Sequence, residues 1–224
     1  MEKTEKLTPR EWIENMWYHY KWLIIFGGLL IAFLVISCFQ FLANDDPDVN
    51  ILHIGPMYIS PEVADKIEAT VGGMAEDYND DGEVNVAILD ITVNKFGTDE
   101  SNTFNYDQYN SALQRFQTEI RAGDAVIYLL DKEYFDICVG EGLLTPLDEV
   151  IDDAYMPENT VDGYGVYVSE LDAFGLEGLS SVPDTAILCL RRSPEKDEIK
   201  YGRTQETWEG NRKTFVNIIK YREN

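Results

Sequence analysis

Val-Asn-Val-Ala-Ile-Leu-Asp-Ile, residues Val84–Ile91, is the stretch of sequence that decides the fold of this chain. It is a nearly continuous apolar run, as expected of a strand in a parallel sheet with both faces covered. Similar strands are predicted at Val49–Ile54 and Ala125–Leu130, and helical periodicity fills the two intervals at residues 60–78 and before Gly123. Strand–helix–strand–helix–strand is two βαβ units. This order predicts an α/β fold with a mostly parallel sheet and right-handed crossovers.

Start and stop signals support both helices. Ser60 can cap the first helix and Pro61 suits its first position, while a glycine follows the second helix. After residue 131 the pattern is looser, and it predicts four further elements. These are a short helix at Lys132–Val139, a brief strand at Gly165–Ser169, a clear strand at Thr185–Arg191 and a last helix at Gln205–Tyr221.

A long apolar segment lies near the N-terminus. Trp22–Ala43 holds 22 residues without a charge, and only Ser37 and Gln40 are clearly polar. At about 1.5 Å per residue this length matches the roughly 30 Å of a bilayer's hydrocarbon core. We therefore predict one transmembrane helix that contacts membrane lipid. The aromatic residues before it, Trp12 and Trp17 among them, are typical of the membrane interface.

The charges around this helix predict its orientation. Basic residues precede it, whereas the chain after it begins with aspartates and has no basic residue before Lys66. Basic segments stay in the cytoplasm, so the C-terminal domain is expected to be extracellular, held by a single-pass anchor in the cell membrane. The predicted organisation is a cytoplasmic amphipathic segment (1–21), a transmembrane helix (22–43), a polar linker (44–48) and an extracytoplasmic α/β domain (49–224).

Processing of the N-terminus offers an alternative to an uncleaved anchor. Val35–Cys38 resembles a permissive lipoprotein motif, in which Cys38 would become the acylated first residue. Against lipidation, the chain stays apolar through Leu42 and the leader before the span is long. Ordinary signal cleavage is disfavoured because Phe41 stands where a small residue is needed. Either outcome leaves the domain tethered outside the membrane.

The composition restricts the partners of the chain. It has 18 basic and 41 acidic residues, a net charge of −23. Residues 1–21 carry four of each sign, so the whole excess follows the transmembrane helix. Phosphate binding needs a basic surface, and nucleic acid is therefore not expected as a partner.

Three cysteines do not make a disulfide framework. Cys38 lies in the predicted span, and Cys138 and Cys189 stand in apolar surroundings, where a free buried thiol is the usual state. A bridge between the last two stays an alternative, because the domain is predicted to lie in an oxidising location.

Asp77–Gly82, with the sequence Asp-Tyr-Asn-Asp-Asp-Gly, matches the first half of a calcium-binding loop. Asp77, Asn79 and Asp81 would supply the oxygen ligands, and the glycine would allow the sharp turn. The position that should offer a bidentate carboxylate is Ile88, which belongs to the predicted strand. A polar turn is the preferred interpretation, and a weak Ca²⁺ site is the alternative. No other cofactor is expected.

The sequence lacks the common catalytic motifs, including Gly-x-Ser-x-Gly, His-Glu-x-x-His, a glycine-rich phosphate loop and Cys-x-x-Cys. Of its two histidines, His19 lies at the membrane edge and His53 lies in the first strand, where a satisfied core residue is commoner than a base. The pair Arg191-Arg192 is expected to be solvated or to balance charge, with an anion site as the alternative. We therefore predict a protein that is not an enzyme.

The segment around the third strand resembles the extracellular solute-binding proteins of ABC importers. Arg121–Asp131 is similar to the end of a helix in Ala-Gly-Asp and the strand that follows it in that family. Tyr134-Phe135 and Gly142–Asp148 (Gly-Leu-Leu-Thr-Pro-Leu-Asp) resemble the short helix and the turn that come next. The order of elements is similar from Val49 to Ser169. The aromatic leader and single span also resemble membrane-anchored proteins of Gram-positive bacteria.

The resemblance implies one lobe of a periplasmic-binding-protein-like fold. Members of that family hold solute in the cleft between two α/β lobes. Here about 35 residues separate Val150 from the strand at Thr185. A domain with its own core needs at least about 50 residues, so the sequence predicts a single reduced lobe.

A single lobe favours an interaction module over a solute receptor. Binding pockets typically cover about 70–90% of a small ligand's surface, and one open lobe leaves much of that surface in water. The expected partner is a protein of the membrane or the cell envelope, and the alternative is delivery of a small solute to an ABC importer. In this topology the binding face forms at the ends of the parallel strands. The predicted partner-binding residues there are Met57, Asn94, Asp131 and Tyr134.

Overall fold

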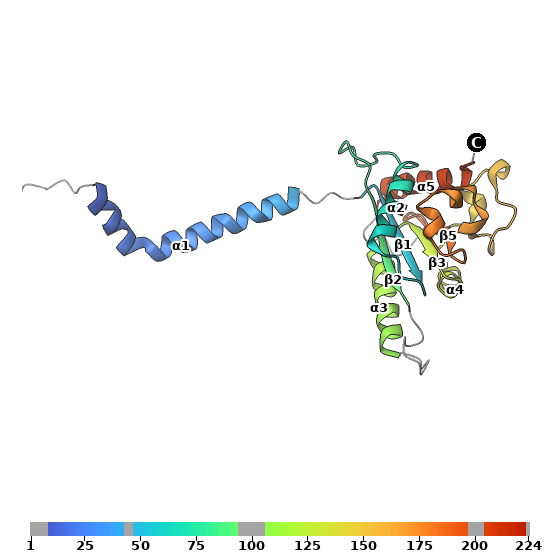
Figure 1. Cartoon of the computed structure of the whole chain (residues 1–224), viewed down its shortest axis with the longest axis horizontal. Helices are drawn as coiled ribbons and strands as arrows, with labels where there is room; N and C mark the ends of the chain where they lie inside the picture. The colour runs from blue at the N-terminus through green and yellow to red at the C-terminus, as the bar shows by residue number, and fades with distance from the viewer. Residues whose placement is uncertain (1–8, 43–46, 94–105, 197–203, 223–224) are drawn as a thin grey trace, which may run out of the picture. The chain divides into compact units, whose positions relative to one another are not determined.

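The computed structural model describes residues 9–42, 47–93, 106–196 and 204–222 of the chain (Figure 1). The chain divides into two units, Met1–Asp45 and Asp46–Asn224, and each is described by itself.

The first unit contains one helix, α1 (Pro9–Leu42). It begins at Pro9, and proline is favoured at the first position of a helix. Within it, Met16–Cys38 is long and apolar enough to cross a membrane, with a mean hydropathy of 2.3 and no burial against other parts of the protein. By length and composition such a helix is compatible with a membrane anchor or with a signal sequence.

The second unit is an α/β domain with five strands, which confirms the predicted fold class. Its main elements follow one another in the order that the sequence indicates. They are β1 (Val49–Gly55), α2 (Pro61–Gly72), β2 (Val86–Thr92), α3 (Tyr106–Ala122), β3 (Ile127–Leu130), α4 (Lys132–Gly140), β4 (Gly165–Tyr167), β5 (Ile187–Leu190) and α5 (Gln205–Lys220).

The sheet has the strand order β2-β1-β3-β5-β4 and is mixed. The prediction of a mostly parallel sheet is therefore wrong. β1 pairs in parallel with β2 and β3, whereas β5 pairs antiparallel with both β3 and β4. The βαβ pattern ends with β3. β4 and β5 are joined by short 3₁₀ turns, which suffice for antiparallel neighbours because these need no crossover helix.

β1 lies in the middle of the three parallel strands and bonds to both neighbours. Val49 N–H donates to the Asn85 carbonyl at 3.2 Å on the β2 side, and Asp131 N–H donates to the Ile54 carbonyl at 2.9 Å on the β3 side. Odd-numbered residues of β1 thus face β2 and even-numbered residues face β3. Because the three strands are parallel, their carboxyl ends lie together at one end of the sheet, the carboxyl edge.

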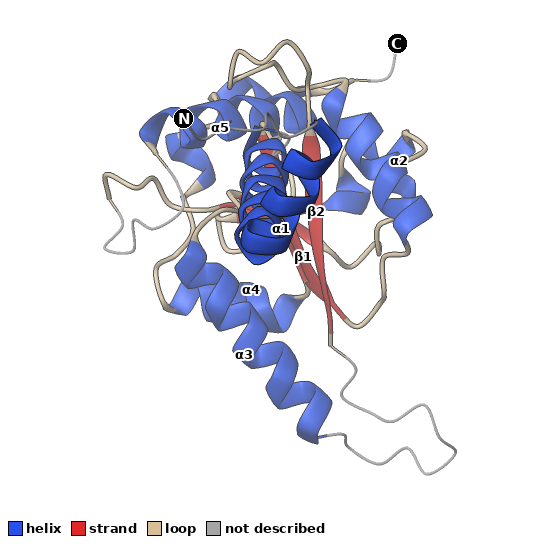
Figure 2. Ribbon diagram, turned by 90° about the vertical axis from the view of Figure 1, so that its left-hand side faces the viewer, coloured by secondary structure: helices blue, strands red, loops and turns tan. Residues whose placement is uncertain are grey.

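Helices cover both faces of the sheet (Figures 1 and 2). α2 and α5 pack on one face, where Val71 and Phe215 are fully buried. α3 and α4 pack on the other face, where Phe116 and Phe135 are buried. With apolar side chains buried on both faces, β3 and β5 are buried along their whole length, as their continuous apolar sequences predict.

α2 begins as predicted and ends earlier than predicted. The Ser60 hydroxyl accepts a hydrogen bond from Val63 N–H at 3.4 Å and caps the helix, with Pro61 in its first position. The helix ends at Gly72, because the Gly72-Gly73 pair has low helix propensity. Tyr78, predicted to lie on the same helix, instead reaches α5.

Asp48 ties the start of the domain to its interior. Its carboxylate accepts hydrogen bonds from the backbone N–H groups of Tyr78, Asn79 and Asn85, at 2.7, 3.1 and 2.8 Å. Its carbonyl accepts a further bond from the Asn211 side chain of α5 at 2.9 Å. One buried aspartate thereby joins β1, the loop before β2 and the last helix.

The segment between β4 and β5 packs against the same core. Val168, Ala173, Leu179 and Val182 are buried with the residues of α2 and α5. Gly178 allows this close approach, because a Cβ at this position would lie 2.2 Å from the Lys66 carbonyl oxygen of α2. The segment belongs to the one α/β unit.

We expect Gly178→Ala to lower the free energy of unfolding by about 2 kcal/mol, because the added methyl group must push the turn away from the α2 backbone. Gly140→Ala is the matched control, since a Cβ there meets no atom within 4 Å. It should change stability by less than about 1 kcal/mol. Urea unfolding of the full chain in detergent measures both. Equal stability of the two variants would contradict the packing of this turn.

Candidate functional site

The carboxyl ends of β1 and β2 hold a histidine–aspartate pair. His53 and Asp90 are register partners, and Nδ1 of His53 lies 2.6 Å from Oδ1 of Asp90. Thr92 Oγ1 donates to the other carboxylate oxygen at 2.7 Å, and Ile59 N–H donates to it at 3.4 Å. Asp90 thus connects both strands with the loop that follows β1.

The pair is largely buried. The side chain of His53 is 1% exposed and that of Asp90 is 14% exposed. Burial raises the pKa of Asp90, but hydrogen bonds from His53 and Thr92 outweigh it and hold the pKa below its ordinary value of 3.8. His53 is the satisfied core residue that the sequence predicts. The sequence did not single out Asp90, although an acid inside an apolar strand is a signal of such a contact.

The loop after β1 presents apolar surface at this edge. Met57 is 46% exposed and Tyr58 is 63% exposed. Both ends of the loop are fixed, since Gly55 belongs to β1 and Ile59 is buried. The sequence singled out Met57 and missed Tyr58, the larger of the two exposed side chains. Asn94, another predicted partner-binding residue, lies outside the described residues.

Asp131 lies at the same edge, at the end of β3. Its carboxylate caps α4 by accepting a hydrogen bond from Glu133 N–H at 3.4 Å. A Cβ added to Gly55 would lie 3.9 Å from the Cβ of Asp131 and 3.4 Å from Nε2 of His53. The structure therefore brings Asp131 together with the His53–Asp90 pair and the end of β1.

Tyr134 is a core residue rather than a surface one. It is 2% exposed and packs edge-on against Phe116 of α3, with ring centroids 5.3 Å apart. Burial, more than the nearby Tyr109 and Asp131, raises its pKa to about 12. Its hydroxyl has no hydrogen-bond partner among the described residues. It supports α4 beneath the edge, and any part that it plays in binding a partner stays a prediction.

The Asp77–Gly82 segment forms a polar turn. Asp77 accepts hydrogen bonds from Asp81 N–H at 3.2 Å and from Gly82 N–H at 2.8 Å, and Asn79 Oδ1 accepts from Asp81 N–H at 2.9 Å. The predicted ligands Asp77, Asn79 and Asp81 are thus brought together, with their oxygens bonded to the turn itself. In the described part of the chain no group of three or more His, Cys, Asp or Glu residues could hold a metal ion. The calcium site stays a prediction.

The cysteines are free thiols in the structure. Cys138 and Cys189 are buried in the core between the sheet and α4. Burial raises the pKa of Cys138 to about 12 and that of Cys189 well above its ordinary value, which disfavours the reactive thiolate. Cys38 lies on α1 and is exposed, and its acylation stays a prediction.

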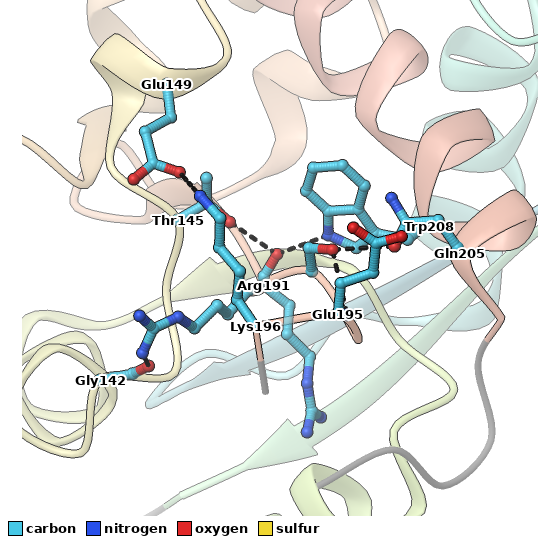
Figure 3. Close-up of polar contacts among 10 residues, drawn as sticks. Gly142, Thr145, Glu149, Arg191, Glu195, Lys196, Gln205 and Trp208 are labelled. Atoms are coloured by element: carbon cyan, nitrogen blue, oxygen red, sulfur yellow. Dashed lines mark hydrogen bonds and ion pairs between the residues drawn. The ribbon is translucent and has the colours of Figure 1, made fainter. Parts of the chain in front are cut away.

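A groove of about 360 Å³ opens at the amino end of α5 (Figure 3). Lys196 Nζ lies 2.5 Å from a Glu149 carboxylate oxygen across it, and Arg212 pairs with Glu209 at 2.8 Å. Arg192 donates to the Gly142 carbonyl at 3.2 Å. Sequence reasoning did not find this groove, because its lining comes from separate segments between residues 142 and 212.

Arg191 lies beneath the groove and is fully buried. The expectation of a solvated Arg191 is therefore wrong. Its guanidinium donates to the Tyr128 hydroxyl at 2.9 Å, and its carbonyl accepts from Trp208 Nε1 at 2.8 Å and Thr145 Oγ1 at 3.0 Å. Every one of these contacts is internal, so Arg191 joins β3, β5 and α5 and does not face the groove as a free cation.

We expect Asp90→Asn to lower the free energy of unfolding by about 2 kcal/mol near neutral pH, because hydrogen bonds to a charged acceptor are lost. The pKa of Asp90 is lowered in the folded state. Its contribution is therefore fully present above the unfolded value of about 4 and is lost as pH falls through the lower folded value. Denaturation of both forms from pH 7 downwards tests this. The exposed Asp65→Asn is the control, and a difference that stays constant at all pH values would contradict the assignment.

Comparisons with models of protein families, with curated proteins and with solved structures find no match to this chain. Its function is therefore argued from the fold and the contacts described above.

Proposed function

We propose that this protein is a single-pass membrane protein whose α/β domain lies outside the cell membrane and binds a protein partner there without catalysis. In this proposal α1 contacts membrane lipid and residues 1–21 lie in the cytoplasm. The partner is a protein of the membrane or the cell envelope. No cofactor takes part.

The N-terminal helix and its flanking charges support the anchor and its orientation. The apolar segment Met16–Cys38 meets the length and hydropathy of a membrane span. Lysines and an arginine precede it, and three aspartates follow it between residues 45 and 48. This asymmetry favours a cytoplasmic N-terminus and an external domain.

A single α/β unit supports protein binding over enclosure of a small ligand. The residues between β4 and β5 pack onto the one core and leave no second lobe within Asp46–Asn224 as described. The largely buried His53–Asp90 pair, with His53 1% exposed, supports a positioning role over acid–base catalysis. A protein interface of about 800 Å² per partner can form on an open face of such a domain.

The observation that carries the proposal is the apolar tip formed by Met57 and Tyr58. These large side chains are exposed on a loop that Asp90 holds to β2 through Ile59 N–H. Methionine and tyrosine are enriched at protein interfaces, where they bury large areas at low entropic cost. The loop lies at the carboxyl edge of the parallel strands, where α/β folds commonly bind their partners.

A solute receptor that serves an ABC importer is the second candidate. The groove beside α5 favours it, because about 360 Å³ falls within the range of small-molecule pockets. Its charged rim is already paired, however, and Lys196 and Arg212 would have to leave carboxylates of their own domain. Submicromolar binding of an amino acid, peptide or sugar to the full chain would favour this candidate over the first.

We expect a photoreactive residue at Tyr58 of the full chain to capture a specific protein in cells. The matched control is the same residue at Tyr155, an exposed aromatic that lies against Lys220 of α5. Met57→Ala should reduce the capture at position 58 by roughly tenfold, since a central interface side chain contributes about 1–2 kcal/mol. Equal capture at both positions, or none at either, would contradict a binding face at the β1 loop.

We expect the protein extracted from membranes to have the mass of the uncleaved chain. A C-terminal tag should be open to protease on intact cells and an N-terminal tag protected, because the charges favour that orientation. A mature chain that begins at an acylated Cys38 would replace the transmembrane anchor with a lipid anchor. Protection of the C-terminal tag would contradict the external location of the domain.

A further inference from the structure

The outer edge of the sheet, formed by the backbone of β2, is long and open. It runs along this strand and is distinct from the carboxyl edge described above. The two edge strands are β2, with seven residues, and β4, with three. A strand at the edge of a sheet presents backbone N–H and C=O groups that can pair with another chain. The longer edge therefore offers a whole strand's length for such pairing.

The ladder identifies which residues of β2 face outward. Val49 N–H donates to the Asn85 carbonyl at 3.2 Å and Val93 N–H donates to the Gly55 carbonyl at 2.8 Å, so odd-numbered residues of this strand bond to β1. Successive residues direct their backbone groups to opposite sides of a strand. The residues that face the open edge are Val86, Ile88, Asp90 and Thr92.

One side chain occupies this edge. Glu68 of α2 accepts a hydrogen bond from Ile88 N–H at 3.1 Å, in the place that a carbonyl of a further strand would take. Among the described residues, no acceptor contacts the N–H groups of Asp90 and Thr92. Glu68 thus covers one of the outward donors and leaves its neighbours open.

The sequence of β2 lacks the usual protection of an edge. Val-Ala-Ile-Leu-Asp-Ile-Thr contains no lysine, proline or glycine, the residues that commonly prevent edge pairing. Its single charged side chain, Asp90, turns to His53 in the interior. Six of its seven residues are partly exposed, whereas β3 and β5 are wholly buried.

The side of the edge next to α2 is acidic. Gly72 lies over Val86, since a Cβ on Gly72 would be 3.7 Å from Val86 Cγ2, and Glu68 reaches Ile88 one turn earlier. The next residue toward the start of α2 on the side of Gly72 and Glu68 is the exposed Asp65. The basic residue beside it, Lys66, pairs with Glu177 at 3.3 Å and is directed elsewhere. Carboxylates therefore flank the open edge on its α2 side.

We propose that the outer edge of β2 binds an extended basic segment of a partner protein as an additional strand. The proposal rests on the proposed function as a protein-binding module and names the mode of binding. A carbonyl of the segment replaces the Glu68 carboxylate at Ile88 N–H, and further bonds form at Asp90 and Thr92. Lysine or arginine side chains of the segment then pair with Glu68 and Asp65.

Charge decides between a partner segment and a second copy of this chain. Pairing of two β2 edges would bring Glu68 and Asp65 of one copy against the same residues of the other. Each copy also carries a net charge of −23. Like charges across an interface oppose association, whereas a basic segment gains at every such contact.

Amide hydrogen exchange of the full chain in detergent tests the proposal at single residues. The probe is a blocked peptide of alternating lysine and valine as long as β2, and its glutamate–valine counterpart is the control. At about four times its dissociation constant, the lysine peptide should slow exchange at Asp90 and Thr92 by about fivefold. Leu89 and Ile91 already bond to β1 and should not change.

Two variants separate strand pairing from general attraction of a cation. Ile88→Pro removes an outward donor, keeps the β1 ladder and should abolish the protection. Because this proline also alters packing, Glu68→Gln is the second variant, and it should weaken the lysine peptide by roughly threefold, as expected of a partly exposed ion pair. Glu62→Gln, on the exposed side of the same helix, is the matched control and should leave binding unchanged.

Each outcome decides the matter. Slowed amide exchange with both peptides, or with neither, overturns the proposal. Equal slowing at odd- and even-numbered residues of β2 overturns it too. If exchange at Asp90 and Thr92 slows as the protein concentration rises without any peptide, the edge pairs with a second copy of the chain and the proposal is wrong. If Tyr58 still captures a partner that Ile88→Pro does not release, strand addition is wrong and the proposed function stands. If position 58 captures no partner while the lysine peptide still slows exchange at Asp90 and Thr92, strand addition stands and the proposed binding face at the β1 loop is wrong.

Discussion

The position of β1 between β2 and β3 is the constraint on which the rest of the domain depends. Because its odd-numbered residues bond to β2 and its even-numbered residues to β3, the register of all three strands is set by one strand. The pairing of His53 with Asp90 follows from that register. A slip of one residue would turn the two side chains to opposite faces of the sheet, leaving each buried without its partner. The buried Asp48 opposes such a slip, since it holds the start of β1 to the loop before β2 and to α5.

The elements of the domain were predictable from sequence, whereas the directions of its last two strands were not. β1, α2, β2, α3 and β3 carry strong periodicity, and clear signals mark the start of α2 (Ser60) and the end of α3 (Gly123). The direction of β5 carries no such signal, because an apolar strand of four residues fits a parallel or an antiparallel neighbour equally well. The 19 residues between β4 and β5 fold into 3₁₀ turns rather than a crossover helix, and nothing in their length required that.

The candidate site was predictable as a place and less so as a set of residues. The carboxyl edge follows from the βαβ order, and Met57 and Asp131 do lie there. Exposure is harder to infer, since Tyr134 sits on the inner side of α4 although charged residues stand at 131–133 and at 136. Asp90 could not be assigned to His53 before the strand register was known. Contacts between distant segments, such as that of Arg191 with Tyr128, leave no pattern in one sequence.

The acidity of the domain is unevenly compensated, and this bears on what can bind where. Nine of the fourteen basic residues after residue 43 lie between residues 191 and 222. In the described part of that region they neutralise acidic turns near α5, as Lys220 does with Asp152 and Lys196 does with Glu149. α5 packs under β1 and β3, whereas β2 forms the edge of the sheet.

Glu68 of α2, beside β2, instead accepts a hydrogen bond from Ile88 N–H. Such a carboxylate at a sheet edge does two things at once. It occupies a backbone donor, which limits pairing with the many neutral or acidic strands that the domain meets. It also favours a strand that brings its own cations, because such a strand replaces the bond to Ile88 and pairs the displaced Glu68. Selectivity at this edge can thus arise from the same residue that protects it.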